Sequence, residues 1–380
     1  MNRGIVPLVR RSFSCPRAHL RGFSLVELLV GLFLGLLLLT GLSALMVQSS
    51  GAFRAVQNEA AMVDNGRYVT DLLANEINHV GFFGHYATDP DLEPSGPLPT
   101  PCSIDKNTLK SIIRDSLPLR VYEGANTDPT GGCLSNYLRN TDVVVVHRAS
   151  TVLIAPSALK DNAGRFFIQT DELGTNFTVD QATTDCATNA DRFDFRGRDR
   201  STEAQPIGYD SWSDYLDCFS SAAALDLREM LTYIYYLSAC DDCSSDGDDL
   251  PTLKRGQIIS DTSGNVTLQP VTISRNIDNL QVFLNTDSSP YDGDPDSFQI
   301  SPSAMPSIAA WAHITGAELF LLFRADQETI QGTNEQDRRY LLGPDSTVDA
   351  NWIDADDGFK RRVFRVQLRL NNLSDRNIES

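Results

Sequence analysis

The chain has 380 residues, and 32 lysines and arginines against 50 aspartates and glutamates give it a formal net charge of −18. Such an acidic chain repels nucleic acid phosphates, and no clustered basic patch offsets this, so DNA binding is excluded. The length suffices for one elaborated domain or two small ones after any N-terminal helix.

Residues 1–22 are basic, and residues 23–47 are mostly apolar and carry one charge, Glu27. The apolar run exceeds the roughly 20 residues that a helix needs to cross a bilayer. Five arginines and no acid precede it, which predicts a cytoplasmic N-terminus and an extracytoplasmic body. The arginines are Arg3, Arg10, Arg11, Arg17 and Arg21.

Glu27 is costly in such a segment, by about 2.5–3.5 kcal/mol at the centre of a span and by less near its end. A cleaved signal peptide normally has a shorter apolar region of about 7–15 residues. A plain uncleaved anchor explains the length of the run but neither Gly22 nor Glu27. A role for the carboxylate itself is therefore the favoured interpretation.

The order Gly22, Phe23, Ser24, Leu25, Val26, Glu27 resembles the class III prepilin signal of type IV pilins and type II secretion pseudopilins. The resemblance implies cleavage between Gly22 and Phe23 by a prepilin peptidase, followed by N-methylation of Phe23. It also implies that Glu27 pairs with the N-terminal amine of a neighbouring subunit and so sets the axial register. The alternative for Glu27 is a carboxylate that stays hydrated near the lipid headgroups.

The helical pattern continues beyond the apolar run, since apolar residues recur at steps of three and four and no proline interrupts from Phe23 to Tyr86. One helix over 23–84 is expected, with 23–47 in the membrane or filament core. Gly31, Gly35 and Gly41 fit either close helix packing or a local bend.

The pattern then turns to strands, separated by long polar loops. This predicts an α+β, pilin-like fold, in which the long helix packs on an antiparallel sheet with disulfide-bearing loops over residues 85–380. The expected strands are 142–148, 164–170, 231–237, 256–260, 265–274, 279–285, 314–323 and 362–370.

Six cysteines follow the span, and an even number outside the cytoplasm indicates disulfides. A seventh, Cys15, lies in the leader. Six cysteines allow fifteen pairings, and we expect neighbours to pair: Cys102 with Cys133, Cys186 with Cys218, and Cys240 with Cys243. A metal or redox role for the Cys240–Cys243 pair is the alternative, but it lacks a second such pair or a βαβ setting.

No enzyme signature is found, and neither a catalytic residue nor a cofactor is predicted. His79 and His85 are six residues apart, which does not suit a helical metal pair. Asp292, Asp294 and Asp296 alternate as calcium ligands can, but the glycine and closing glutamate of an EF-hand loop are missing from their places. A solvated turn is the expected reading.

Several downstream segments together resemble the PilW family of minor pilins. They are 65–68, 81–84, 141–148, 235–237, 251–255, 277–282 and 361–369. The resemblance implies a subunit that primes type IV pilus assembly, caps the pilus tip, and supports twitching motility and adhesion. Its partners would be other minor pilins, the major pilin, the inner-membrane assembly platform and a large tip adhesin. A secretion pseudopilin and a membrane-anchored periplasmic binding or enzyme domain are the alternatives.

Overall fold

The computed structural model consists of two compact units, residues 1–57 and 58–380, which we describe separately. The structure describes residues 24–84, 94–103, 108, 112–113, 115–154, 165–170, 195–196, 226–260, 266–289, 291–328, 338–355 and 357–374. Gly22, Phe23, His85, Cys186 and Cys218 lie outside these ranges.

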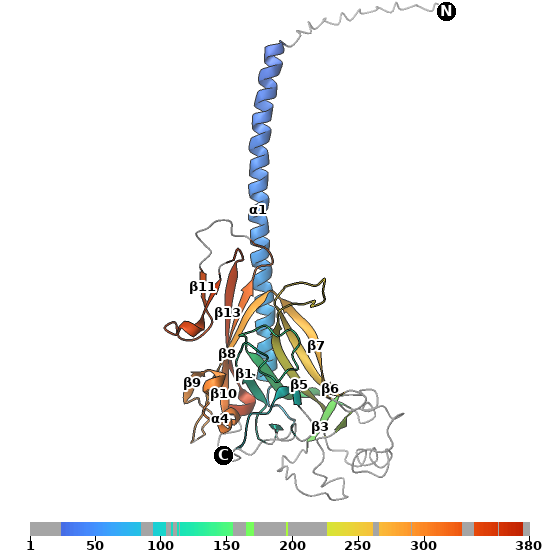
Figure 1. Ribbon diagram of the computed structural model, residues 1–380, viewed down its shortest axis with the longest axis vertical. Helices are drawn as coiled ribbons and strands as arrows, with labels where there is room; N and C mark the ends of the chain where they lie inside the picture. Colours follow the sequence, from blue (N-terminus) through green and yellow to red (C-terminus); the bar gives the residue numbers. More distant parts are fainter. Residues whose placement is uncertain are drawn as a thin grey trace, which may run out of the picture. The chain divides into compact units, whose positions relative to one another are not determined.

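The helix α1 spans Leu25–Asn78 and is shared by both units (Figure 1). Its buried residues follow a helical spacing and are confined to the second unit: Met62, Gly66, Val69, Leu73, Glu76 and Ile77. The helix ends earlier than the expected 84. Gly81 has φ +75°, and its backbone N–H donates to the His147 carbonyl instead of continuing the helix.

The first sheet is antiparallel, and its strands follow the order β1-β2-β5-β3-β4, with β6 and β7 continuing from β5. The long strand β5 pairs along its length with β2, β3 and β6, which extends the sheet to seven strands. The strands are β1 (Leu119–Tyr122), β2 (Val143–Leu153), β3 (Phe166–Thr170), β4 (Phe195–Arg196), β5 (Asp226–Ser238), β6 (Thr252–Ser260) and β7 (Val266–Arg275).

A second antiparallel sheet has the order β13-β10-β8-β9, and a small hairpin pairs β11 with β12. Only the longer strands among these were expected from the sequence, because the short ones carry too few residues for a clear alternation. The strands are β8 (Ile277–Thr286), β9 (Ser297–Ile300), β10 (Ile314–Arg324), β11 (Arg338–Leu341), β12 (Trp352–Ala355) and β13 (Arg361–Arg369). The short helices α4 (Ile308–Ala312) and α5 (Asn371–Ser374) complete this part.

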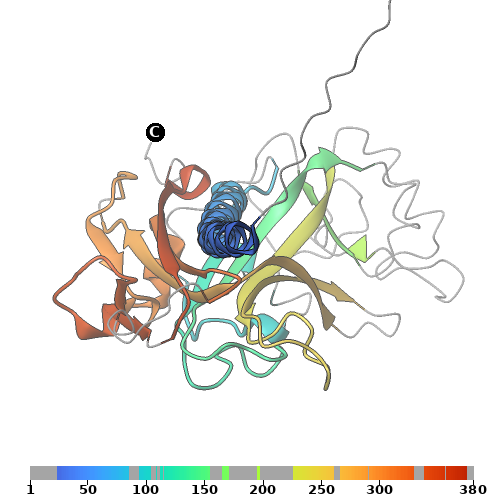
Figure 2. The same ribbon diagram turned by 90° about the horizontal axis from the view of Figure 1, so that it is seen from above.

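The C-terminal part of α1 packs against both sheets (Figure 2). Leu73 and Ile77 of the helix share one apolar core with Val144 and Tyr235 of the first sheet and with Leu321 of the second. A polar contact adds to this packing. Arg148 of β2 donates from Nε and Nη2 to the two carboxylate oxygens of Glu76, at 3.0 and 3.2 Å. The expected α+β fold is confirmed, with the strands divided between two sheets.

Gly66 allows α1 to approach the ring of Phe364 on β13. A Cβ atom at this position would overlap three carbons of that ring. In an open helix, Gly→Ala stabilises by about 1 kcal/mol. Here we expect Gly66→Ala to destabilise the fold by about 1–3 kcal/mol through overpacking.

The matched control is Gly51→Ala, because Gly51 lies in the same helix with no heavy atom within 4 Å of an added Cβ. Urea unfolding of the detergent-solubilised chain measures both variants. A Gly66→Ala protein as stable as the Gly51→Ala protein would contradict the close packing.

Asp142 links the two sheets, although it is 1 % exposed. Its backbone N–H donates to the Leu280 carbonyl of β8 at 2.9 Å, and its carboxylate accepts from Gly124 N at 2.8 Å and Val282 N at 2.7 Å. Burial raises the pKa of this carboxyl to about 7, against the two hydrogen bonds that favour the charged form.

The raised pKa of Asp142 predicts a pH dependence of stability. The folded state holds this proton more tightly than the unfolded state, whose carboxyl has the ordinary value of 3.8. Stability is therefore lost as pH rises from about 4 to 7, with a slope of up to about 1.4 kcal/mol per pH unit. We expect Asp142→Asn to remove the part of this pH dependence that the Asp142 carboxyl causes. The measurement is the difference in unfolding free energy between the variant and the wild type, followed from pH 5 to pH 8.

His147 has the opposite effect on the pH dependence of stability, since burial and the charge of Arg120 keep its pKa well below 6.5. The unfolded state takes up this proton first, so stability falls as pH drops below about 6.5. The Asp142→Asn protein should therefore lose more stability on acidification than the wild type does. Equal pH profiles for the two proteins would refute the role of Asp142.

Candidate functional site

The first turn of α1 carries Glu27, the only charged side chain between Ser24 and Val47. Leu28 N donates to the Ser24 carbonyl at 3.1 Å, so regular helix bonding begins directly before the glutamate. The Glu27 side chain is exposed. The helix dipole favours an acidic side chain in the first turn of a helix.

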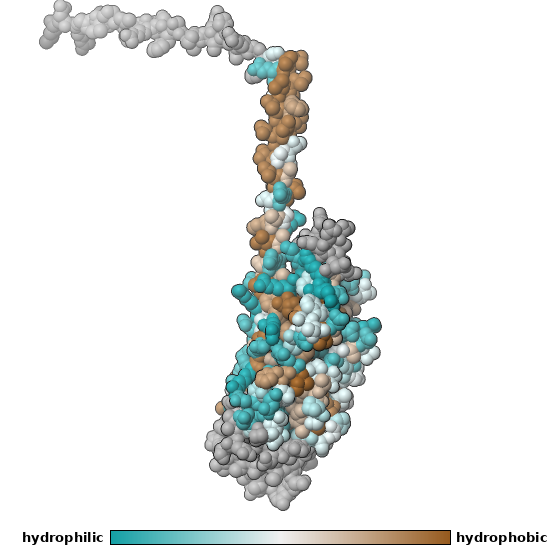
Figure 3. Space-filling view, turned by 90° about the vertical axis from the view of Figure 1, so that its left-hand side faces the viewer, coloured by the Kyte–Doolittle hydropathy of each residue, from teal (hydrophilic) through white to brown (hydrophobic). Residues whose placement is uncertain are grey.

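The apolar part of α1 is long enough and apolar enough to cross a membrane. Its side chains are exposed within the first unit, as the brown surface in Figure 3 shows. The hydroxyls of Thr40, Ser43 and Ser50 donate to backbone carbonyls three or four residues earlier. These hydroxyls are thus satisfied within the helix, as an apolar environment requires.

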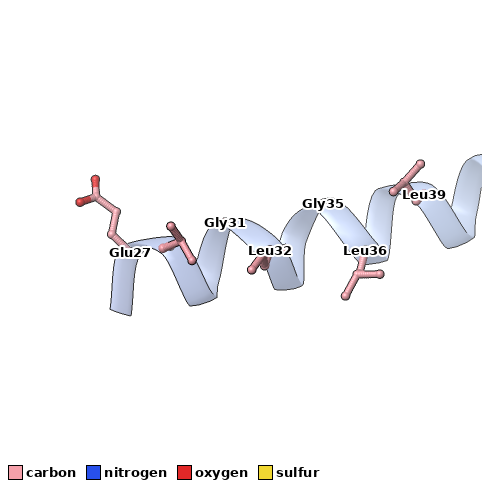
Figure 4. Close-up of a pocket in the computed structure, with 7 residues that line it drawn as sticks. Glu27, Gly31, Leu32, Gly35, Leu36 and Leu39 are labelled. Atoms are coloured by element: carbon pink, nitrogen blue, oxygen red, sulfur yellow. The ribbon is translucent and has the colours of Figure 1, made fainter. Parts of the chain in front are cut away.

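Glu27 stands at one end of a shallow groove on α1 (Figure 4). Gly31 and Gly35 form its floor one turn apart, and an added Cβ at either position would meet no atom within 4 Å. Leucines line the rest of the groove: Leu28, Leu32, Leu36 and Leu39. Small residues at such spacing permit close approach of a second helix in a membrane.

Two of the three expected cysteine pairs fall within the described residues, and both are disulfides. Cys102 is joined to Cys133 with a Cα–Cα distance of 5.5 Å, and Cys240 is joined to Cys243 at 5.3 Å. The Cys240–Cys243 pair is therefore oxidised rather than a metal ligand pair. Asp128 organises the first disulfide loop by accepting from the backbone N–H groups of Thr130, Gly132 and Leu134.

Among the described residues, no group of three or more histidine, cysteine, aspartate or glutamate side chains is arranged to hold a metal ion. His147 is buried between Arg120, at 2.7 Å from Nε2, and the Thr232 hydroxyl, at 2.9 Å from Nδ1. His79 contacts the Asn75 carbonyl through Nδ1, and His313 stacks on Tyr291. Each of these three histidines thus lies in a separate environment.

The acidic positions singled out from the sequence lie in the connection between β8 and β9. Asp292 Oδ1 accepts from Asp294 N at 3.0 Å, and Asp296 Oδ2 accepts from Ser288 N at 3.1 Å. These are turn-stabilising bonds, as a solvated turn predicts. No sequence pattern singles out Asp287, a buried acid of this connection that is 4 % exposed.

An exposed apolar helix with a single carboxylate in its first turn, continuing into an antiparallel-sheet domain, defines a pilin-like protein. Residues 17–43 match the prokaryotic N-terminal methylation motif. Residues 234–372, which run from β5 through β13, match the family "Type IV Pilus-assembly protein W". The chain thus carries a PilW domain and an N-terminal methylation motif, and the resemblance predicted from the sequence is confirmed.

Among solved structures, the chain is similar to the type IV-like pilin TTHA1219 from Thermus thermophilus. The two are 10 % identical, the match covers 82 % of this chain and 97 % of that one, and the TM-score is 0.32. The comparison with curated proteins found no match.

Proposed function

We propose that this protein is a minor pilin that primes type IV pilus assembly at the inner membrane and then sits at the pilus tip. The observation that carries the proposal is the joining of two features in one chain: a methylation-type N-terminus with Glu27 on an exposed apolar helix, and a PilW domain. The role is structural rather than catalytic, and it supports twitching motility and adhesion.

Processing is the first step in this proposal. Cleavage between Gly22 and Phe23 removes the basic leader, and N-methylation modifies the new amine. The apolar helix retains the subunit in the membrane with its domain in the periplasm, as the arginine-rich N-terminus favours. The disulfides support this orientation, because they persist in oxidising compartments.

Assembly is the second step. The groove that begins at Glu27 offers a surface for the helix of a neighbouring subunit, and the carboxylate offers a partner for its N-terminal amine. The proposed partners are the other minor pilins, the major pilin and the inner-membrane assembly platform, with a large adhesin at the tip. A minor pseudopilin of a type II secretion system is the second candidate, since it shares this N-terminal chemistry.

The experiment that tests the proposal combines mass spectrometry of the N-terminus with deletion of the gene. We expect a mature chain beginning at N-methylated Phe23, and fewer surface pili and less twitching in the deletion strain. An unprocessed N-terminus would refute both the pilin and the pseudopilin roles. Normal pili with lost protein secretion would favour the pseudopilin.

A further inference from the structure

The edge strand β9 of the second sheet carries an exposed aromatic side chain, Phe298. It is 63 % exposed, whereas the other phenylalanines whose side chains are described in the second unit are buried or half-buried. Phe283 on β8 and Phe320 on β10, for example, pack edge to face in the same sheet, with their ring centroids 5.7 Å apart. A large apolar side chain is thus left outside the core of a sheet that has an aromatic cluster of its own.

The backbone of β9 is irregular at this aromatic residue. The register with β8 shifts between Leu284 and Thr286. Phe298 and Gln299 therefore face one residue of β8, Asn285, which makes a β-bulge. Gln299 has φ +58°, in the left-handed region that only glycine adopts without cost. Bulges of this kind change the direction of a side chain at the edge of a sheet.

Polar contacts hold Gln299 in this strained conformation. Its backbone N–H donates to Asn285 Oδ1 at 2.9 Å, and its Nε2 donates to Glu318 Oε2 at 2.9 Å. Glu318 is 2 % exposed, and its other oxygen accepts from Arg365 and Gln367 of β13. Backbone strain persists only where the surrounding structure over-determines it, and it is concentrated at functional positions. The exposed aromatic position is therefore fixed by three strands of the sheet.

The chain around Phe298 is negatively charged. Residues 287–307 contain four aspartates and neither lysine nor arginine. Asp292, Asp294 and Asp296 are exposed, and Arg369 approaches Asp294 only to 3.8 Å. A protein that covers the Phe298 ring therefore needs an apolar pocket with basic side chains around it, because facing like charges across an interface is unfavourable.

The strand β9 lies at the end of the second unit where α1 ends (Figure 1). Asn372 Nδ2 donates to the carbonyl of Asn78, the last residue of α1, at 3.1 Å. Leu370 N donates to the carbonyl of Thr315, at the start of β10, at 2.8 Å. The start of β10 pairs with the end of β8, which also pairs with β9. Phe298 is thus presented at the end of this unit opposite to the one that α1 enters.

We propose that Phe298 is the anchor of a protein-docking surface on β9, and that its partner offers an apolar pocket rimmed by lysine or arginine side chains. Large aromatic side chains that fill a pocket supply much of the binding energy of protein interfaces. The aspartates around the anchor favour approach of a basic surface and make the contact sensitive to salt. The proposal uses only the second unit and does not depend on the role in pilus assembly.

Site-specific photo-cross-linking of the full chain in its native cells tests the surface. The photoreactive residue p-benzoylphenylalanine replaces Phe298 in one protein and Val271 in the matched control, since Val271 is also an exposed apolar residue of an edge strand but lies on β7. We expect position 298 to form an adduct with one protein, at a peptide that borders an apolar pocket with basic neighbours. In solubilised membranes, the yield should fall between about 50 mM and about 500 mM NaCl, as charge screening predicts.

The identified partner is then purified, and its binding to the detergent-solubilised full chain is measured. Phe298→Ala should weaken binding about tenfold or more, as loss of an anchor does. Asp294→Lys should weaken binding and reduce its salt dependence. The controls Val271→Ala and Asp246→Lys, which change an exposed residue of β7 and an exposed aspartate of the β5–β6 connection, should leave the affinity unchanged.

Several results would overturn the docking surface. They are an adduct at position 298 only with lipid or with a second copy of the chain, an adduct whose yield does not depend on salt, and the absence of any protein adduct. An equal loss of affinity in Phe298→Ala and Val271→Ala would also overturn it. An unprocessed N-terminus would refute the pilin role alone, so the two proposals fail separately.

Discussion

Replacing Glu27 by leucine is expected to abolish incorporation of the subunit into filaments while leaving its processing intact. The substitution makes the apolar segment more hydrophobic, so membrane insertion does not suffer. It removes the carboxylate that would pair with the N-terminal amine of a neighbouring subunit. Leaving that amine unpaired in an apolar bundle costs about 3–5 kcal/mol, which is about 10²–10³-fold or more in the association constant.

The measurement is the amount of the subunit in sheared pili, normalised to the amount in the membrane fraction. Mass spectrometry of the same membrane fraction establishes that the leader has been removed. Glu59→Leu is the matched control, because Glu59 is also an exposed acid on α1 but lies beyond the apolar segment. Normal incorporation of the Glu27→Leu protein would show that the carboxylate simply stays hydrated.

Replacing Glu76 by alanine should lower the free energy of unfolding by about 3 kcal/mol. The Glu76 and Arg148 side chains are only 11 % and 14 % exposed, so the substitution leaves a guanidinium without its partner between α1 and β2. Breaking a buried pair in this way typically costs 3–5 kcal/mol, and the residual exposure of this pair favours the lower end of the range. Urea unfolding, followed by circular dichroism, measures the loss.

Two further variants separate the loss of the ion pair from a general effect of substitution. The double variant Glu76→Leu and Arg148→Leu should recover most of the stability, because replacing both charges leaves no unpaired group. Asp354→Ala breaks an exposed pair with Arg339 and should change stability by less than about 1 kcal/mol. A Glu76→Ala protein as stable as the Asp354→Ala protein would refute the role of the buried pair.

Features encoded by neighbouring residues could be predicted from the sequence. The apolar length, the arginines before it and the position of Glu27 are all local, and they define the membrane segment and the prepilin-like signal without any tertiary contact. Long strands could be anticipated in the same way, because the alternation in β13 and the continuous apolar run in β10 are short-range patterns. The disulfides between Cys102 and Cys133 and between Cys240 and Cys243 each join two cysteines with no other cysteine between them in the sequence.

Features that depend on distant partners could not be predicted. Nothing in the sequence distinguishes Asp142 from other aspartates. It links the two sheets only because the fold brings the backbone N–H groups of Gly124 and Val282 to its carboxylate. Asp287 is likewise one of several acids in a loop, and only the structure shows that it is buried. The division of the strands into two sheets was likewise missed, since periodicity identifies a strand but not the strand with which it pairs.

The sequence by itself thus determined the apolar segment, the N-terminal methylation motif and the α+β class, because each depends on residue types within a few turns of one another. Only the tertiary structure decided how α1 is held to the domain, through Gly66 beneath Phe364 and through the pair of Glu76 and Arg148. These contacts join residues far apart in the chain, and their energies come from burial and close approach, which no local pattern encodes.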